Sequence, residues 1–433
     1  MIDYTPESSL GWLDFDAATS ERVATLLRSL QEPSTLDVLG LGTIRDAFAD
    51  MLSPGVSTVQ TRLRYFIFLP WIFQRLEAES VPPGQFARTL REAETKLIDC
   101  LRKGGDDGVI GSRAHRSLKR MPSEIYWGGL GAWGIRRLDM SIAEYGQWAS
   151  APRPRPERDN DGNATTRDVT MWAADIPQPS EPFLDDKTDE ETDFEIDFNL
   201  SADEALFLTE RIRQSQPGSL LAELSAKPEV PIDVDYPWEL DSGSLPGPLT
   251  EVLRHARCFS ELTLGPQLVY NVLLARRAEK ELGWDKGKLR EGQSQMLVEW
   301  ADRDSGQWDT LESWAGNLPD FWDLLAGWRI GAATQNFVND LARRAVEDPK
   351  GFARDSGVHE LIAGRERRLK ANRARLVNRS ALENWNGAAV GGQFDYRWPT
   401  TKRYLKDLAA AMPPAGNAPH PVRAAEEPSR GRG

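Results

Sequence analysis

Apolar residues recur along this chain with the spacing of amphipathic helices. The stretch SERVATLLRSLQEP, residues 20–33, shows the pattern clearly, because its apolar side chains fall at positions i, i+3, i+4 and i+7 and therefore share one helix face. Pro33 ends the pattern. The same spacing predicts further helices over residues 44–52, 86–101, 201–214, 249–282, 293–301, 321–346 and 359–379.

The stretch SADEALFLTERIRQ, residues 201–214, also carries a helix start signal. Ser201 and Glu204 have the spacing of a capping box, in which each side chain satisfies an exposed backbone amide of the first turn. Alternating apolar and polar positions joined by Asn-Gly or Asp-Gly turns, which are typical of β-hairpins, are almost absent from the chain. We therefore predict an all-α, multi-helical fold.

One break in composition divides the predicted helices into two groups. The stretch APRPRPERDNDGNATT, residues 151–166, is rich in proline and charge, and an acidic run follows it at 181–198. Two helical lobes joined by a long irregular connection fit this pattern. We expect an N-terminal lobe at 1–150, the connection at 151–200, a C-terminal lobe at 201–412 and a disordered tail at 413–433, which has little apolar surface to bury.

The stretch SPGVSTVQTRLRYFIFLPWIFQRLE, residues 53–77, combines two patterns. Ser57 and Gln60 have capping-box spacing, and Arg62 and Arg64 follow as basic residues do in the first turns of a DNA-recognition helix. A recognition helix, however, needs one polar face for water or DNA.

The second half of that stretch lacks such a face. Every residue from Tyr65 to Phe73 is apolar or proline, which predicts a helix that is buried on all sides. Pro70 should kink or end it. We therefore favour a core helix over a recognition helix, with Arg62 and Arg64 near the surface or paired with acids.

Composition places the chain among globular proteins, at 40% apolar and 27% charged residues. Two cysteines predict no disulfide framework and fit a reducing cytoplasm. The longest apolar run, at 65–73, is far shorter than the roughly 20 residues that span a bilayer. The sequence MIDYTPESSLGWLDFD lacks the basic start of a signal peptide. We therefore expect a cytoplasmic protein without membrane contact.

The net charge of −13 is unevenly distributed. The run EPFLDDKTDEETDFEIDF, residues 181–198, contains nine acids and one lysine, so it supplies most of the negative charge. A run of this kind is most often a solvated loop. The overall charge therefore neither supports nor excludes a nucleic-acid partner.

Motifs for metal, nucleotide and nucleophilic chemistry are missing. The four histidines are far apart, and no zinc spacing, Walker loop or Gly-x-Ser-x-Gly elbow occurs. His255 and Cys258 share a predicted helix face, where a packed core pair is favoured over a ligand pair. The sequence therefore predicts no catalytic residue, no metal site and no cofactor.

Glycines and tryptophans suggest packing rather than binding. In YWGGLGAWGIRR, residues 126–137, a tight aromatic-packed turn is favoured over a dinucleotide loop, because no convincing strand precedes it. In AAVGGQFDYRW, residues 388–398, we expect a loop whose glycines let Tyr396 and Trp398 pack closely. Four tryptophans within residues 308–328 stand beside acids, which would repel phosphate, so a core role is favoured over base stacking.

One segment favours nucleic acid. In GRERRLKANRARLVNR, residues 364–379, seven basic residues stand against one acid. On a continuous helix the arginines would form one stripe, which suits a phosphate backbone. A solvated helix face, or pairing with the acidic run, is the alternative. The candidate nucleic-acid-binding residues are Arg365, Arg368, Arg375 and Arg379, together with Arg62 and Arg64.

Three blocks of the chain resemble an uncharacterised bacterial family that is defined by a domain of unknown function. The blocks are TLDVLGLGTIRDAFADMLSPGVSTVQTRLRYFIFLPW, SEIYWGGLGAWGIRR and NRSALENWNGAAVGGQFDYRWPTTKRYLKDL. The resemblance covers most of the chain except 151–200 and the tail. It implies a genetic context beside helicases and other genes of phage-defence islands, and it implies no catalytic residues.

Together these observations predict a non-catalytic accessory component of a bacterial DNA-directed system, in phage defence or DNA processing. It would bind nucleic acid, a helicase-type partner, or both. An enzyme such as a nuclease, whose carboxylates come together only on folding, stays an alternative. A purely structural scaffold is a third possibility.

Overall fold

A computed structural model describes residues 37–105, 107–151, 170–179 and 196–412, and the structural statements below refer to these residues. They form α-helices and short 3-10 turns, and the only bridge between extended residues joins Arg136 to Trp172. The all-α, multi-helical fold predicted from the apolar spacing is confirmed. The predicted helix at 20–33, the tail at 413–433 and most of the predicted connection lie outside the described residues.

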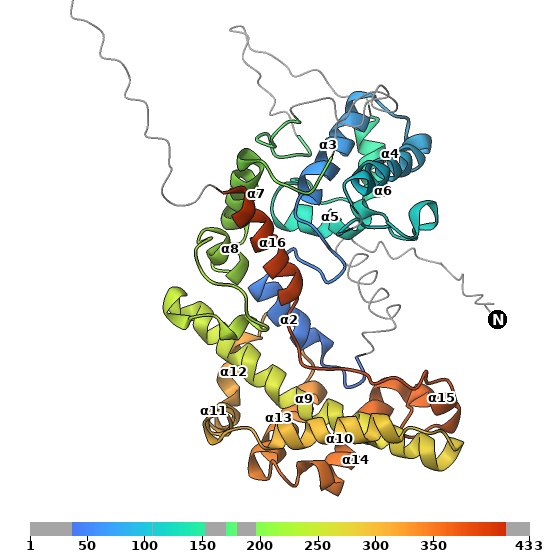
Figure 1. Cartoon of the computed structure of the whole chain (residues 1–433), viewed down its shortest axis with the longest axis vertical. Coiled ribbons are helices and arrows are strands. Elements are labelled where there is room, and N and C mark those ends of the chain that lie inside the picture. The colour runs from blue at the N-terminus through green and yellow to red at the C-terminus, as the bar shows by residue number, and fades with distance from the viewer. Residues whose placement is uncertain (1–36, 106, 152–169, 180–195, 413–433) are drawn as a thin grey trace, which may run out of the picture.

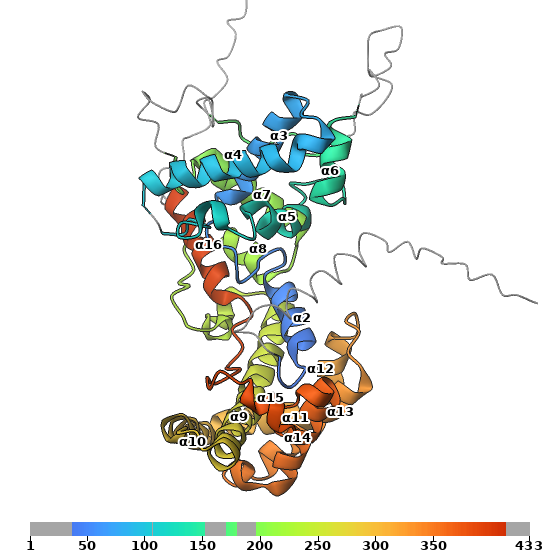
Figure 2. The same ribbon diagram turned by 90° about the vertical axis from the view of Figure 1, so that its right-hand side faces the viewer.

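The helices form two groups in space (Figures 1 and 2). The first group contains helices from both halves of the chain: α3 (Tyr65–Ala78), α4 (Pro83–Lys103), α5 (Pro122–Ala132), α6 (Ile142–Ala149), α7 (Ala202–Ser215), α8 (Leu220–Ser225) and α16 (Trp398–Ala411). Short 3-10 turns at His115–Ser117, Pro237–Glu239 and Ser242–Ser244 complete the loops before α9. Helices α7, α8 and α16, from the lobe expected at 201–412, therefore lie in one group with α3 to α6, from the lobe expected at 1–150.

The second group is arranged around one long helix, α9 (Gly247–Leu282). Against it pack α10 (Gly287–Ala301), α11 (Ser305–Gly316), α13 (Ala332–Glu347), α14 (Ser356–Lys370) and α15 (Arg379–Glu383). The short helix α12 (Leu318–Leu324) and 3-10 turns at Phe352–Arg354 and Ala371–Arg373 join them. Helix α2 (Gly42–Leu52) contacts α8 of the first group and α9 of the second, so it links the two groups.

Helix α3 is the buried centre of the first group. Phe66, Phe68, Trp71 and Phe73 are exposed by 0%, 1%, 7% and 0%, so the predicted core helix is confirmed. Pro70 lies inside this helix and does not end it. Proline removes one backbone hydrogen bond, and burial on every side of α3 outweighs that loss.

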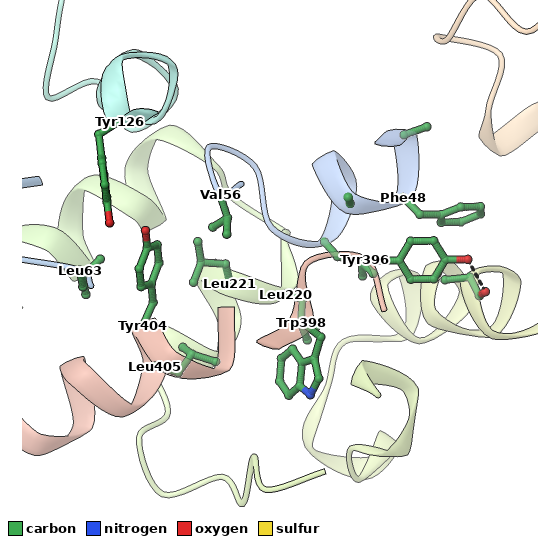
Figure 3. Close-up of a cluster of buried hydrophobic side chains, with 14 of the residues drawn as sticks. Phe48, Val56, Leu63, Tyr126, Leu220, Leu221, Tyr396, Trp398, Tyr404 and Leu405 are labelled. Atoms are coloured by element: carbon green, nitrogen blue, oxygen red, sulfur yellow. Dashed lines mark hydrogen bonds between the residues drawn. The ribbon is translucent and has the colours of Figure 1, made fainter. Parts of the chain in front are cut away.

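A continuous aromatic core connects the last helix to the first group. Figure 3 shows Tyr404 of α16 pointing toward Tyr126 of α5, and Trp398 lying beside Leu220 of α8. Tyr396 lies just before α16, and its hydroxyl donates to the carbonyl of Ala256 on α9 at 2.7 Å. The return of the chain at 396–411 therefore fastens both helix groups together.

Two predicted helices are broken in the structure. The helix expected over 321–346 ends at Leu324, and α13 begins only at Ala332. The intervening stretch contains Gly327 and Gly331, and Gly331 caps α13. The helix expected over 359–379 ends at Lys370, because Ala371 adopts a positive φ of 47°. The helical spacing of apolar residues continues through both breaks in the sequence. The backbone conformation at the breaks nevertheless ends each helix.

Described parts of the predicted connection belong to the core. Met171, Trp172 and Ile176 are buried, as are Ile196 and Phe198. The indole nitrogen of Trp71 also donates to the carbonyl of Pro177 at 2.7 Å. The described residues of 151–200 form no helix, but they cover one side of α3.

The glycine-rich block at 126–137 is mostly helical, so the predicted tight turn is wrong for residues 126–132. A Cβ on Gly129 would lie 2.6 Å from the carbonyl oxygen of Gly55 and 2.8 Å from the Phe66 ring. A Cβ on Gly128 would have no atom within 4 Å. Gly129 therefore allows α5 to approach α3 closely, while Gly128 has no packing requirement.

These neighbouring glycines give a matched test of the packing. We expect Gly129→Ala to lower the free energy of unfolding by about 1–3 kcal/mol, because the added methyl group overpacks the contact. Gly128→Ala should raise it by up to about 1 kcal/mol, because alanine is the better helix former. Urea denaturation of both variants measures the difference. Equal effects would contradict the close approach of α5 and α3.

Candidate nucleic-acid interface

Arg62 and Arg64 precede α3 and are held by acids from distant parts of the chain. The Arg62 guanidinium donates to both carboxylate oxygens of Asp407 on α16, at 3.0–3.2 Å. Arg64 binds Glu204 of α7 at 3.0 Å and Asp197 at 3.1 Å. The predicted pairing with acids is confirmed. Paired guanidinium groups of this kind fasten α3 to α7 and α16.

Arg365 is buried, at 4% exposure. Its guanidinium donates to the carbonyls of Leu39 and Gly40 at 2.8 and 3.1 Å, and to the hydroxyl of Thr334 at 2.9 Å. The ring of Phe337 lies beneath it, 5.1 Å from the guanidinium carbon. Arg365 therefore holds the segment before α2 against α13, and its donors face the protein interior.

The other three predicted arginines do not form one helical stripe with it. Helix α14 ends at Lys370, so only Arg368 shares that helix with Arg365. Arg375 is partly buried, and its backbone amide donates to the buried carboxylate of Glu366 at 3.0 Å. Arg379 begins α15 and pairs with Glu383 at 3.1 Å. The stripe geometry is wrong, because the chain turns at Ala371.

The turn nevertheless brings these residues to a second basic segment. The side chain of Arg277 on α9 donates to the carbonyls of Arg375 and Val377 at 3.0 and 2.9 Å. Residues 276–291 and 364–383 therefore lie together, and both figures place them at the end of the molecule opposite α3 and α4. The two segments carry thirteen basic and six acidic side chains. We call this surface the basic end.

Several cations of the basic end have no anionic partner among the described residues. These cations lie on two segments, one formed by α9 and α10 and the other by α14 and the turn that follows it. The following side chains are exposed and form no ion pair or hydrogen bond with other described residues: Arg276, Lys280, Lys288, Arg367, Arg368 and Arg373. A chain with a net charge of −13 thus has a local excess of free positive charge.

Trp284 and Lys286 of the basic end form a group with Trp385, which follows this surface in the chain, and this group was not predicted from the sequence. Trp284 and Lys286 lie in the loop between α9 and α10, and Trp385 follows α15. The Lys286 ammonium is 5.4 Å from the Trp284 ring centroid and 5.6 Å from that of Trp385. The sequence signal that could have indicated this group is the motif WDKGKLR at 284–290, in which cations alternate after an aromatic residue.

The described residues on either side of 180–195, a segment that holds most of the acidic run, lie far from the basic end. Residues 180–195 lie outside the described residues. On one side of them the carbonyl of Pro177 accepts from Trp71, and on the other side Asp197 pairs with Arg64. Both attachments are at α3, at the opposite end of the molecule from α14 and α15 (Figure 1).

A separate groove of about 1820 Å³ runs between α5 and the helices α4 and α6. Glu94 lies at its floor with 1% exposure, and its carboxylate accepts from the amide and hydroxyl of Ser123 at 2.6 and 3.0 Å. Burial raises the pKa of Glu94 to about 7, although both hydrogen bonds act to lower it. The cations and acids that line this groove are nearly balanced in number, which does not suit a phosphate backbone.

The residues considered for metal binding or base stacking have internal roles. His255 and Cys258 are buried, and the Nδ1 atom of His255 accepts from the indole of Trp314 at 2.9 Å. Their expected packing in the core is confirmed. Among the described residues, no group of three or more His, Cys, Asp and Glu side chains is arranged to hold a metal ion. None of the described helices has the length and apolar character needed to cross a membrane.

The fold and this surface define an all-α, multi-helical protein with a basic end on an acidic chain. The chain belongs to DUF6361, a family of unknown function, whose model matches residues 7–412. The resemblance to an uncharacterised family is therefore confirmed. No curated protein and no solved structure is significantly similar to the chain.

The buried carboxyl of Glu94 predicts a specific pH dependence of stability. Its pKa in the folded protein, about 7, lies above the ordinary value of 4.5. The folded state therefore binds the proton more tightly than the unfolded state, and the stabilisation is lost as pH rises from about 4.5 to about 7. Glu94→Gln imitates the protonated form. Between pH 5 and pH 8 the parent should lose up to about 3 kcal/mol of stability relative to this variant.

Glu144 provides the control for that measurement. Its pKa is lowered by hydrogen bonds from the backbone and side chain of Ser141, so its contribution changes only at more acidic pH. Denaturant unfolding of the parent, Glu94→Gln and Glu144→Gln at pH 5 and pH 8 tests the prediction. A stability difference between parent and Glu94→Gln that stays constant over this range would contradict the burial of an ionisable carboxyl.

Proposed function

We propose that this protein binds nucleic acid through its basic end and acts without catalysing a reaction itself. The observation that carries the proposal is the group of exposed cations, from two chain segments, that have no ion-pair partner among the described residues of an otherwise acidic chain. Such a surface releases condensed counterions when it meets a phosphate backbone, and this release supplies most of the affinity.

The chemistry of these residues supports phosphate contact rather than base reading. Arg367, Arg368 and Arg373 can each donate two parallel hydrogen bonds to phosphate oxygens, and Lys280 and Lys288 add point charges. Contacts of this kind position a nucleic acid without specifying its sequence. Arg62, Arg64 and Arg365 are engaged inside the protein, so the proposal does not use them.

The choice of DNA as the nucleic acid rests on the genetic context that the family resemblance implies. In that context the protein is an accessory component of a DNA-directed system, in phage defence or DNA processing. It would hold DNA for a helicase-type partner.

The proposal predicts a salt-dependent interaction that one triple variant abolishes. The full-length protein should bind fluorescent DNA of arbitrary sequence at low salt, and log K should fall linearly with log salt concentration. Replacing Arg367, Arg368 and Arg373 with Glu should reduce the affinity at least a hundredfold. Fluorescence anisotropy titrations at several salt concentrations measure both effects.

A second triple variant controls for net charge. Lys103, Arg113 and Arg213 are also exposed, but they lie in the first helix group. Changing them to Glu alters the net charge by the same amount and should leave most of the affinity intact. Equal loss in both variants, or no binding by the parent at low salt, would refute an interface at the basic end. Cleavage of the DNA during the titration would favour the enzyme alternative.

A further inference from the structure

An aromatic pair with one buried and one partly exposed ring lies at the basic end. Trp284 and Trp385 are stacked with ring centroids 6.2 Å apart and an angle of 25° between the planes. Trp385 is buried at 3% exposure, and its indole nitrogen donates to the carbonyl of Ala388 at 2.8 Å. Trp284 is partly exposed. The inner ring therefore supports the outer one and holds it in place at the surface.

A lysine accompanies this aromatic pair. Lys286 lies over both rings, and a Cβ on Gly387 would be 2.2 Å from its ammonium nitrogen. Glycine at 387, with a positive φ of 81°, therefore leaves room for the cation beside the rings. Lys288 follows on the first turn of α10 and is exposed. Aromatic rings interleaved with cations are the arrangement that single-stranded nucleic acids require.

We propose that the basic end binds single-stranded nucleic acid, with an unpaired base stacked on Trp284 and the adjacent phosphates at Lys286 and Lys288. This inference rests on the proposed function and names its substrate class. In a duplex the faces of the bases are covered by neighbouring bases, so a duplex offers Trp284 no free base to stack on. A single strand can turn one base onto the ring while its backbone stays on the cations.

The test compares two ligands and three variants of the full-length protein. The ligands are a fluorescent oligothymidine and a fluorescent duplex with the same number of phosphates. The parent should bind the single strand more tightly. Trp284→Leu should weaken single-strand binding by roughly tenfold or more, since stacking contributes a large part of the affinity per base. It should leave duplex binding unchanged, and Trp284→Phe should retain most of the single-strand affinity.

Trp238 supplies a matched control, because it is also partly exposed and stacked on a neighbour, Tyr236, at 4.8 Å. Trp238→Leu should leave both affinities unchanged, and circular dichroism melting checks that each variant is folded. Tighter binding of the duplex by the parent would overturn the inference without any variant. The inference would also be overturned if Trp284→Leu weakened the binding of both ligands equally, or if it weakened the binding of neither. If the parent binds neither ligand, the proposed function itself fails.

Discussion

The structure depends on one constraint, which is that residues 65–73 of α3 are apolar around the whole helix and must be covered on every side. Local helices α4 and α5 cannot cover it alone. The described residues near 171–176 and 196–198 close another side. The last helix, α16, contributes Tyr404 beside Phe66, with ring centroids 6.0 Å apart. The buried helix thus requires distant parts of the chain to return to it, and this requirement brings both halves of the sequence into one group of helices.

The pairing of cationic side chains near the core follows from the same constraint. The two arginines before α3 cannot avoid the edge of the core, so each is matched by carboxylates from α7, α16 or the segment before α7. Arg365 is likewise satisfied by carbonyl oxygens. The cationic side chains near the core are therefore engaged in contacts that hold the fold together. The exposed side chains of Lys280, Arg367 and Arg368, near the ends of α9 and α14, have no such role among the described residues, which leaves them available for a ligand.

The sequence predicted those features that depend on local pattern. The burial of Phe66 and Phe73, the capping box at Ser201 and the long helix at 249–282 all match the structure, because spacing along one helix determines them.

Features that depend on distant partners could not be predicted. Arg365 was counted as a surface residue because its partner, the carbonyl of Leu39, is 326 residues away. The break at Ala371 requires a positive φ at a residue that rarely adopts one. The basic end combines segments about a hundred residues apart, as the contact between Arg277 and Val377 shows. Only the fold puts Trp284 beside Trp385 and so reveals a platform for stacking.

The central claim is that nucleic acid lies on the basic end, and ultraviolet cross-linking tests it most directly. A uniform oligothymidine would be irradiated with the full-length protein at low salt, and the cross-linked peptides would be identified by mass spectrometry. The account predicts that the cross-links fall within residues 276–291 and 364–388, with Trp284 among the modified residues. Cross-links concentrated instead along the groove between α4, α5 and α6 would contradict it.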